Sequence, residues 1–349
     1  ERTLNRNTEA FDDCDLVPKI LANVGKPDLS TTVFGRKISM PIFLSPAAMQ
    51  RLYHPEGDKA SARAAEKFNT FYSMSTMSNN SIEQIANLSS GPKLFQLYIH
   101  KDQSITDDLI DRCKRANFDG LCLTVDTIVA GNRERDHRTG FTTPPKLTLK
   151  SLFSFAIKPK WVFDYLTNEK FELSNVKNKT DKGTNITKSV IEYINEQYDP
   201  GMNWSDAEYV VKRWDKPFAI KGVMSVEDAK RAVDIGCTAI MISNHGGRQL
   251  DGSRSPFDQI KLISDAVGDK VDIILDGGVR RGTHVLKAIA AGAKACSFGK
   301  AFLFSLSAGG QKGVEKLLQN MHDEIQRNMI LMGCKNLKDL NYSRLIFRR

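Results

Sequence analysis

Eight apolar runs of strand length recur along the chain, and most are followed by an amphipathic segment of helix length. The runs cover residues 41–45, 71–75, 93–98, 120–126, 217–222, 239–242, 272–278 and 295–299, and helices are predicted near 55–69, from 81, and at 104–116, 225–235, 257–267, 282–291 and 309–332. Strands that alternate with helices form a parallel sheet, and eight such units close a (β/α)8 or TIM barrel. We therefore predict an α/β fold in which residues 1–349 form one TIM-barrel domain. An open, doubly wound sheet is the alternative.

Polar side chains at the ends of these runs favour the barrel over the open sheet. They are Gln96, Tyr98, Thr124, Asp126, Lys221, His245 and Asp276. In a barrel the carboxyl ends of all strands converge on one face, where barrel enzymes have their active sites. In an open sheet the same residues would be spread along an edge. The convergence predicts an active site at that face.

The connection between Asp126 and Pro217 is far longer than an ordinary link from strand to helix. We expect residues 138–203 to form an extended insertion after the fourth strand, since long loops in compact domains are usually functional or disordered. Residues 152–166 mix aromatic and aliphatic side chains with lysines. That composition suits either an anchor that meets a membrane surface through residues 146–170 or a lid over the active site. The sequence leaves both interpretations open.

The balance of charges points to anionic partners. The chain has a net charge of +9, which favours small acids, phosphates or lipid headgroups. Nucleic acid is not expected, because no recognised binding motif accompanies the charge. The cysteines lack CxxC spacing and are predicted to be reduced, mostly buried thiols of a cytoplasmic protein, with no metal site: Cys14, Cys113, Cys122, Cys237, Cys296 and Cys334. The chain begins at Glu1 without a methionine, and we expect that a first segment is missing.

Residues 243–252 place a histidine and an arginine beside two glycines at the end of an apolar strand. Glycines allow a sharp turn, so His245 and Arg248 can face one space. An imidazole can move a proton while a guanidinium binds a carboxylate, which suits an acid substrate. For these two residues alone, a solvated turn is the alternative. Asp126, at the end of the fourth strand, could orient His245.

Two further cationic side chains are candidate residues of the site. Lys221 ends the fifth strand, and a buried lysine needs an anionic partner. Schiff-base chemistry and stabilisation of negative charge on a cofactor are both open to it. Arg133 lies in a charged run that could equally be a solvated turn.

Two glycine-containing turns stand after the last two strands, where many barrels bind a phosphate. The first contains Asp276, Gly277, Gly278 and Arg280, and the second contains Gly299 and Lys300. Each turn alone is a weak signal. Their position predicts a phosphorylated cofactor or substrate across the mouth of the barrel.

These segments together resemble the FMN-dependent (S)-2-hydroxy acid oxidases and dehydrogenases, a family that includes glycolate oxidase, L-lactate dehydrogenase and mandelate dehydrogenase. The resemblance extends from about Thr3 to Leu345 and is carried by residues 39–49, 95–98, 123–126, 243–251 and 276–282. It implies that the protein binds FMN and oxidises a 2-hydroxy acid to the 2-oxo acid. Side chains cannot accept an electron pair, so a flavin must supply the acceptor.

The resemblance also implies roles for individual residues. Catalysis would involve His245 as the base, paired with Asp126, together with Tyr98, Arg248 and Lys221. The substrate would bind to Tyr98, Arg133, His245 and Arg248. FMN would be held by Pro46, Ala47, Ala48, Ser75, Gln96, Thr124, Lys221, Ser243, Asp276, Gly277, Gly278, Arg280, Gly299 and Lys300.

Several positions depart from the family pattern. A substrate-binding tyrosine that the family has in an N-terminal segment is absent here. Lys300 stands where an arginine is usual, which keeps the charge but loses bidentate geometry. Met77 and Ala130 stand where glycolate oxidase has a tryptophan and a leucine. The smaller side chains predict a wider pocket and a substrate such as lactate or a longer or aryl 2-hydroxy acid.

Residues 159–161 and their aromatic surroundings are similar to the membrane-associated lactate and mandelate dehydrogenases. This similarity predicts a peripheral enzyme on the cytoplasmic face of the inner membrane that passes electrons to a quinone or another respiratory acceptor. A soluble oxidase that uses O2 is one alternative, and a non-redox FMN barrel such as type 2 isopentenyl diphosphate isomerase is another. The family also implies a homo-oligomer, a tetramer.

Overall fold

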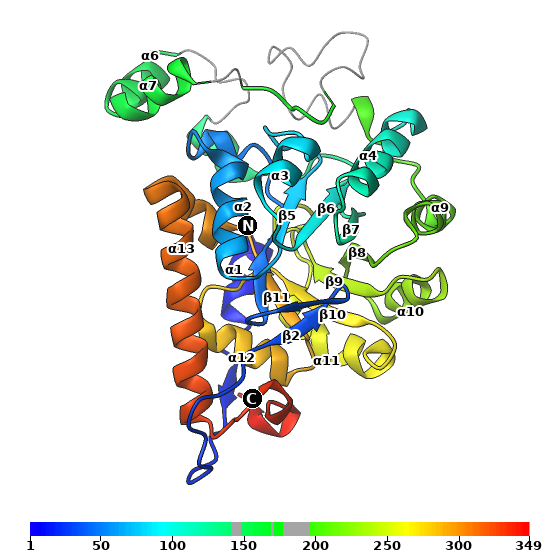
Figure 1. The fold of residues 1–349 in the computed structure, drawn as a ribbon, viewed down its shortest axis with the longest axis vertical. Helices are drawn as coiled ribbons and strands as arrows, with labels where there is room; N and C mark the ends of the chain where they lie inside the picture. Colours follow the sequence, from blue (N-terminus) through cyan, green and yellow to red (C-terminus); the bar gives the residue numbers. More distant parts are fainter. Residues whose placement is uncertain (141–147, 169–170, 177–195, 349) are drawn as a thin grey trace.

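A computed structural model describes residues 1–140, 148–168, 171–176 and 196–348. Eight parallel strands close into a barrel in the order β10-β11-β4-β5-β6-β7-β8-β9, which confirms the predicted TIM barrel (Figure 1). The strands are β4 (Ile42–Leu44), β5 (Tyr72–Ser75), β6 (Lys93–Leu97), β7 (Gly120–Thr124), β8 (Phe218–Val223), β9 (Ala239–Ser243), β10 (Asp272–Asp276) and β11 (Ala295–Phe298).

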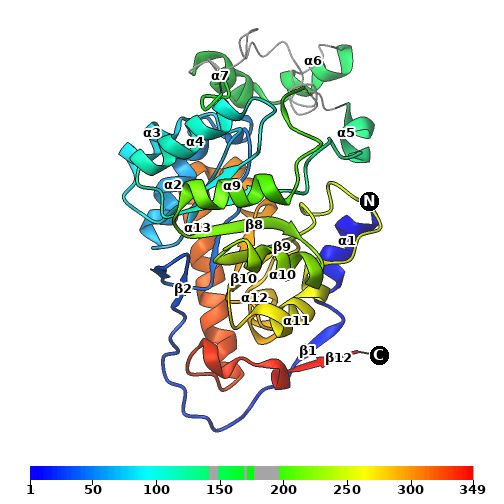
Figure 2. The same cartoon turned by 90° about the vertical axis from the view of Figure 1, so that its right-hand side faces the viewer.

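A layer of helices surrounds the barrel. It consists of α2 (Gly57–Lys67), α3 (Ile82–Leu88), α4 (Gln103–Arg115), α9 (Trp204–Trp214), α10 (Val226–Asp234), α11 (Pro256–Val267), α12 (Gly282–Ala290) and α13 (Lys300–Leu331). The connection from β7 to α9 contains three more helices, α5 (Glu134–Thr139), α6 (Leu149–Ala156) and α7 (Pro159–Thr167). Figures 1 and 2 place α6 and α7 at the end of the molecule opposite the C-terminus.

Smaller elements close the rest of the structure. The N-terminal helix is α1 (Arg2–Glu9), and β1 (Cys14–Leu16) pairs antiparallel with β12 (Leu345–Phe347). The strands β2 (Thr31–Val33) and β3 (Arg36–Ile38) form a hairpin. Its apolar side chains pack against the lower barrel interior, by which we mean the apolar part of the interior below the polar carboxyl ends of the strands. The short 3-10 helices of the described chain are η1 (Gln50–Leu52), η2 (Leu337–Asp339) and η3 (Tyr342–Arg344).

Strand periodicity explains how the barrel interior changes from apolar to polar. Successive side chains of a strand point to opposite faces, so residues two apart share a face. The lower interior contains Phe43, Leu94, Cys122, Ala219, Met241, Ile274 and Ala295. Two residues further along the same strands stand Ser45, Gln96, Thr124, Lys221, Ser243, Asp276 and Ser297, all buried. Polar side chains therefore form a ring at the carboxyl end of the strands, while the rest of the barrel interior is apolar.

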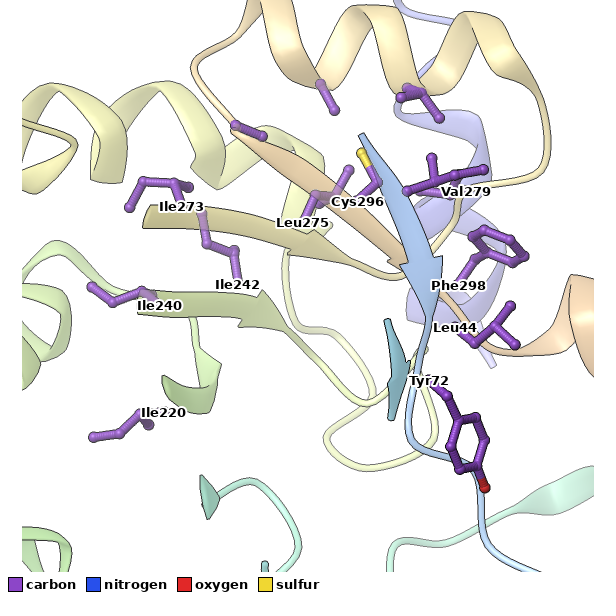
Figure 3. Close-up of a cluster of buried hydrophobic side chains, with 14 of the residues drawn as sticks. Leu44, Tyr72, Ile220, Ile240, Ile242, Ile273, Leu275, Val279, Cys296 and Phe298 are labelled. Atoms are coloured by element: carbon purple, nitrogen blue, oxygen red, sulfur yellow. The ribbon is translucent and has the colours of Figure 1, made fainter. Parts of the chain in front are cut away.

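The alternate residues pack outward against the helices. Figure 3 shows part of this outer layer, with Ile240 and Ile242 of β9 beside Ile273 and Leu275 of β10. All four side chains are at most 2% exposed. This explains why the strands read as continuous apolar runs, as expected for a sheet covered on both faces.

Two details refine the sequence predictions. The last helix was predicted from residue 309, but α13 begins at Lys300 and bends at Gly309 and Gly310, where φ of Gly310 is +55°. A Cβ at Gly310 would collide with the ring of His54, so the bend accommodates a close approach. All six cysteines are buried and free, as predicted. No helix within the described ranges is long and apolar enough to cross a membrane.

Candidate active site

A cavity of about 290 Å³ opens at the polar end of the barrel. Most of the predicted site residues line it: Pro46, Ala47, Ala48, Ser75, Gln96, Tyr98, Thr124, Arg133, Lys221, His245, Arg248, Asp276, Gly277, Gly278, Arg280, Gly299 and Lys300. Asp126 and Ser243 do not line the cavity, but they hydrogen-bond to the lining residues His245 and Lys221. The predicted site residues that line this cavity come from positions as far apart in the chain as Pro46 and Lys300.

A histidine and a carboxylate form a pair on one side of the cavity. Nδ1 of His245 lies 2.8 Å from Oδ1 of Asp126, and the hydroxyl of Thr127 lies 3.0 Å from the same carboxylate oxygen. Burial alone would raise the pKa of Asp126, but the charges of His245 and Lys221 and the hydrogen bonds from His245 and Thr127 hold it below its usual value. The carboxylate thus stays ionised, and Nδ1 of His245 donates to it. Nε2 is left as the basic nitrogen.

Backbone conformation places Arg248 beside this histidine. His245, Gly246 and Gly247 all have left-handed φ values, +57°, +66° and +72°. A non-glycine residue in this region is strained, and such strain concentrates at functional sites. A Cβ at Gly247 would collide with the backbone of Leu4, so the turn also requires glycine for packing.

Two arginines lie on the same side of the cavity without a full set of partners. Burial and the charge of Arg248 lower the pKa of Arg133. Nε of Arg133 is buried and has no hydrogen-bond partner among the described residues. Among the described residues, the carboxylate nearest to Arg248 is that of Asp136, whose Oδ2 lies 4.0 Å from Nη2 of Arg248. Two close guanidinium groups of this kind favour an anion between them.

A buried ion pair lies at the centre of the barrel. Nζ of Lys221 is 2.9 Å from both Oδ2 of Asp276 and Oγ of Ser243. Hydroxyl groups of Ser45, Ser243 and Ser297 donate to the same carboxylate. Burial opposes the charge of Lys221, but Asp276 and Asp126 raise its pKa above the usual value. The lysine is therefore charged, and its position is fixed by Asp276.

Another part of the cavity lining is also cationic. Arg280 and Lys300 line it, and α13 begins there without a side-chain cap. Gly278 has a φ of +75°, and a Cβ there would collide with the carbonyl oxygen of Asn7 in α1. Positive side chains beside free N–H groups at the start of a helix suit a phosphate.

Comparison with known families decides the identity of this site. Residues 1–347 match the family described as FMN-dependent dehydrogenase. The chain belongs to this family. Glycolate oxidase 5 of Oryza sativa subsp. japonica is 38% identical over 346 residues, which cover 99% of this chain and 88% of that protein. L-lactate oxidase of Nostoc sp. is 38% identical over 352 residues, with coverage of 98% and 89%.

Solved structures of mandelate dehydrogenases have the same fold. The monotopic membrane protein (S)-mandelate dehydrogenase superposes with a TM-score of 0.93 at 30% identity, covering 99% of this chain and 91% of that one. A soluble mutant of the membrane-associated (S)-mandelate dehydrogenase from Pseudomonas putida gives 0.83 at the same identity and coverage. The protein is thus an FMN-dependent oxidoreductase of the 2-hydroxy acid oxidase and dehydrogenase type.

The cavity of this FMN-dependent dehydrogenase fits its cofactor. Nε2 of Gln96 and Oγ1 of Thr124 are buried, and neither has a hydrogen-bond partner in the described part of the chain. Leaving such groups unsatisfied costs about 1–3 kcal/mol each, so a ligand with polar ring atoms is expected beside them. Arg280 and Lys300 suit the phosphate of the same ligand.

Lys300 gives a testable pH dependence of FMN binding. Burial and the charges of Arg280, Arg248 and Arg135 lower the pKa of Lys300 to about 8, and Glu1 acts in the opposite direction. The charged form is therefore present below pH 8 and is lost above it. We expect the FMN dissociation constant of the apoprotein to rise by up to about tenfold per pH unit above that pH. In Lys300→Arg this dependence is expected to disappear, as measured by flavin fluorescence titration. Equal pH profiles for both proteins would contradict the assignment.

The sequence did not single out Tyr53, Thr127 or Tyr198. Thr127 and Tyr53 line the cavity, and Thr127 bonds to Asp126. Tyr198 stacks on Tyr98 with ring centroids 4.5 Å apart. Thr127 follows Asp126 directly, so its position next to the strand end was a usable signal, whereas Tyr198 belongs to the long connection and carried none.

Proposed function

We propose that the protein oxidises an (S)-2-hydroxy acid, L-lactate or a larger one, and passes the electrons to a quinone or another respiratory acceptor. The observation that carries the proposal is the His245–Asp126 pair, whose histidine lines the same cavity as Arg133 and Arg248. A base and a carboxylate clamp beside a flavin site are what oxidation of a 2-hydroxy acid requires.

Each side chain has a part in the proposed reaction. Nε2 of His245 accepts a proton from the substrate, and Asp126 stabilises the imidazolium that forms. Arg133 and Arg248 bind the carboxylate, while the hydroxyl group of Tyr98 binds the substrate hydroxyl. FMN, when bound, supplies the two-electron acceptor, and Lys221 stabilises the negative charge of its reduced form.

The same residue assignments apply to FMN in this proposal. Ser75, Gln96 and Thr124 bind the polar edge of the ring system, and Pro46, Ala47 and Ala48 form its apolar wall. Arg280, Gly278, Gly299 and Lys300 hold the phosphate end. Ser243 acts indirectly, because its hydroxyl lies between Lys221 and Asp276.

Pocket width supports a substrate larger than glycolate. Met77 lines the cavity and is 3% exposed, whereas Ala130 lies outside the lining. We expect L-lactate and longer or aryl 2-hydroxy acids to bleach the flavin faster than glycolate under anaerobic conditions. Reoxidation by a quinone is expected to be faster than by O2. A flavin that no 2-hydroxy acid bleaches would refute the function, and rapid reoxidation by O2 would favour a soluble oxidase.

The helices α6 and α7 support the proposed acceptor and location. Their stacked aromatic rings face inward, with Phe155, Trp161 and Tyr165 in sequence, and Nε1 of Trp161 donates to the carbonyl oxygen of Leu52 at 2.8 Å. Large apolar side chains are left exposed on the same two helices: Leu149, Leu152, Phe153, Phe163 and Leu166. Exposed apolar side chains on a segment that also exposes Lys158 and Lys160 suit the interfacial region of a membrane.

Similarity to the mandelate dehydrogenase structures supports the same proposal, since the monotopic membrane form has the higher TM-score, 0.93 against 0.83 for the soluble mutant. We propose a peripheral enzyme on the cytoplasmic face of the inner membrane, assembled as a homotetramer. The lid interpretation of α6 and α7 is the alternative.

Liposome binding tests this location. The triple variant Phe153→Ser, Phe163→Ser and Leu166→Ser removes three side chains that are 66–73% exposed. We expect the wild type to sediment with anionic liposomes and the variant to stay largely in the supernatant, since each large apolar side chain contributes about 1.5–3 kcal/mol when buried. Leu21→Ser is the matched control, because Leu21 is 97% exposed but lies outside α6 and α7. Wild-type protein that remains in the supernatant would favour the lid.

A further inference from the structure

We propose that Tyr198 is a positioning residue for the reaction: its ring fixes the orientation of Tyr98, and thereby places the Tyr98 hydroxyl between the substrate and the Thr127–Asp126–His245 chain. The proposal rests on the function proposed above, in which Tyr98 binds the substrate hydroxyl. It concerns a residue that returns from the long β7–α9 connection and that does not itself line the cavity.

Tyr198 is firmly held against the segment that follows β6. It is 2% exposed, and its ring stacks on that of Tyr98 at 4.5 Å with an interplanar angle of 27°. His100 meets the same ring edge-on at 5.6 Å. The backbones of His100 and Tyr198 form an antiparallel bridge, and the N–H of Lys101 donates to the carbonyl oxygen of Gln197 at 2.8 Å. Backbone and ring contacts therefore both fix the position of Tyr198 beside Tyr98.

Tyr98 lies between the hydrophobic core and the cavity. It stands just beyond the last residue of β6, and its N–H donates to the hydroxyl of Thr76 at 3.3 Å. The hydroxyl of Thr127 acts on Tyr98 by lowering its pKa, and this hydroxyl lies 3.0 Å from Oδ1 of Asp126 and 3.1 Å from Nδ1 of His245. A rotation of the Tyr98 ring would therefore move its hydroxyl away from both the base and the substrate. The stacked face of Tyr198 opposes that rotation.

Replacing the ring of Tyr198 distinguishes a positioning role in catalysis from a general role in protein stability. In Tyr198→Leu we expect kcat/KM for a 2-hydroxy acid to fall by about tenfold, the order of one aromatic pair interaction. Tyr198→Phe keeps the ring and is expected to restore kcat/KM to within about threefold. In the background of Tyr98→Phe, the change Tyr198→Leu is expected to have little further effect, because the hydroxyl that Tyr198 positions is already gone. An equal loss in both backgrounds would overturn the proposal.

Phe118→Leu is the matched control. Phe118 is 1% exposed and packs edge-on at 6.1 Å against Phe95, in the same strand that precedes Tyr98. The control variant is expected to lose stability while keeping kcat/KM and its response to Tyr98→Phe. If it lowered kcat/KM as Tyr198→Leu does, the effect would be one of general packing, and the positioning role would be wrong.

A second readout does not depend on turnover. Burial and the charge of Asp126 raise the pKa of Tyr98 to about 12. Spectrophotometric titration of each protein against its Tyr98→Phe counterpart isolates the ionisation of Tyr98. We expect Tyr98 to ionise at lower pH in Tyr198→Leu than in the wild type, because its ring is no longer covered. An unchanged titration would overturn the positioning role even if no 2-hydroxy acid reduced the flavin, so the two proposals fail separately.

Discussion

Flavin reduction by a 2-hydroxy acid is expected to slow by about 10³- to 10⁴-fold when His245 is replaced by glutamine, with FMN still bound. Glutamine keeps the size of the side chain but has no basic nitrogen, so the substrate proton has no acceptor. Anaerobic rapid mixing, followed through the visible absorbance of the oxidised flavin, measures the rate. FMN content and the unliganded flavin spectrum establish that the cofactor site is intact.

Asp126→Asn tests the partner of the same base. The carboxylate lies 2.8 Å from Nδ1 and stabilises the protonated imidazole, so the amide is expected to slow flavin reduction by about 10²-fold or more. His322→Gln is the control, because His322 lies on α13 beside Asp323, outside the cavity. A His245→Gln protein that reduces its flavin at the wild-type rate would show that another group takes the proton.

Loss of the carboxylate clamp is the second large effect. In Arg133→Leu we expect kcat/KM for the acid to fall by about 10²- to 10³-fold, since truncating one partner of a buried charge pair costs about 2–5 kcal/mol. For the methyl ester of the same acid the fall is expected to be small, because the ester has no charge to bind. The ratio of kcat/KM for acid and ester therefore reports on the clamp directly.

Arg138→Leu is the matched control, because Arg138 lies on α5, the helix that Arg133 precedes as its N-cap residue. Arg138 is 73% exposed and pairs with Glu134 one turn away, whereas Arg133 lines the cavity. Its removal is expected to leave both acid and ester kinetics unchanged. An equal loss of acid and ester turnover in Arg133→Leu would contradict a role in binding the carboxylate.

The barrel could be predicted from sequence because its signals are local. Each strand is a short apolar run, and strand geometry alone sends residues two apart to the same face. Counting from Met241 to Ser243, or from Ile274 to Asp276, already predicts which side chains meet at the polar end. The convergence of Lys221, His245 and Asp276 in one cavity follows from these local rules and the closure of eight strands.

Contacts between distant segments could not be predicted in this way. The glycine turn at Asp276 predicted a phosphate site, and the family resemblance assigned Asp276 to FMN. In the structure Asp276 lines the cavity, and its carboxylate binds Lys221 and the hydroxyl groups of three serines. Ser45, just after β4, lies 231 positions from Asp276 in the sequence, whereas Ser297 comes from the next strand, β11. Tyr198 reaches Tyr98 from a connection whose path no periodic pattern specifies.

The pairing of Lys221 with Asp276 has a consequence for the midpoint potential of bound FMN. An isolated lysine beside the flavin would raise that potential strongly, because it would stabilise the more negative reduced form with a full positive charge. The carboxylate of Asp276, 2.9 Å from Nζ, cancels much of this charge at longer range. Three serine hydroxyls fix the orientation of the resulting dipole. With FMN in the position proposed for it, the barrel would act on the potential of the flavin through the direction of this local field as well as through the charge of Lys221.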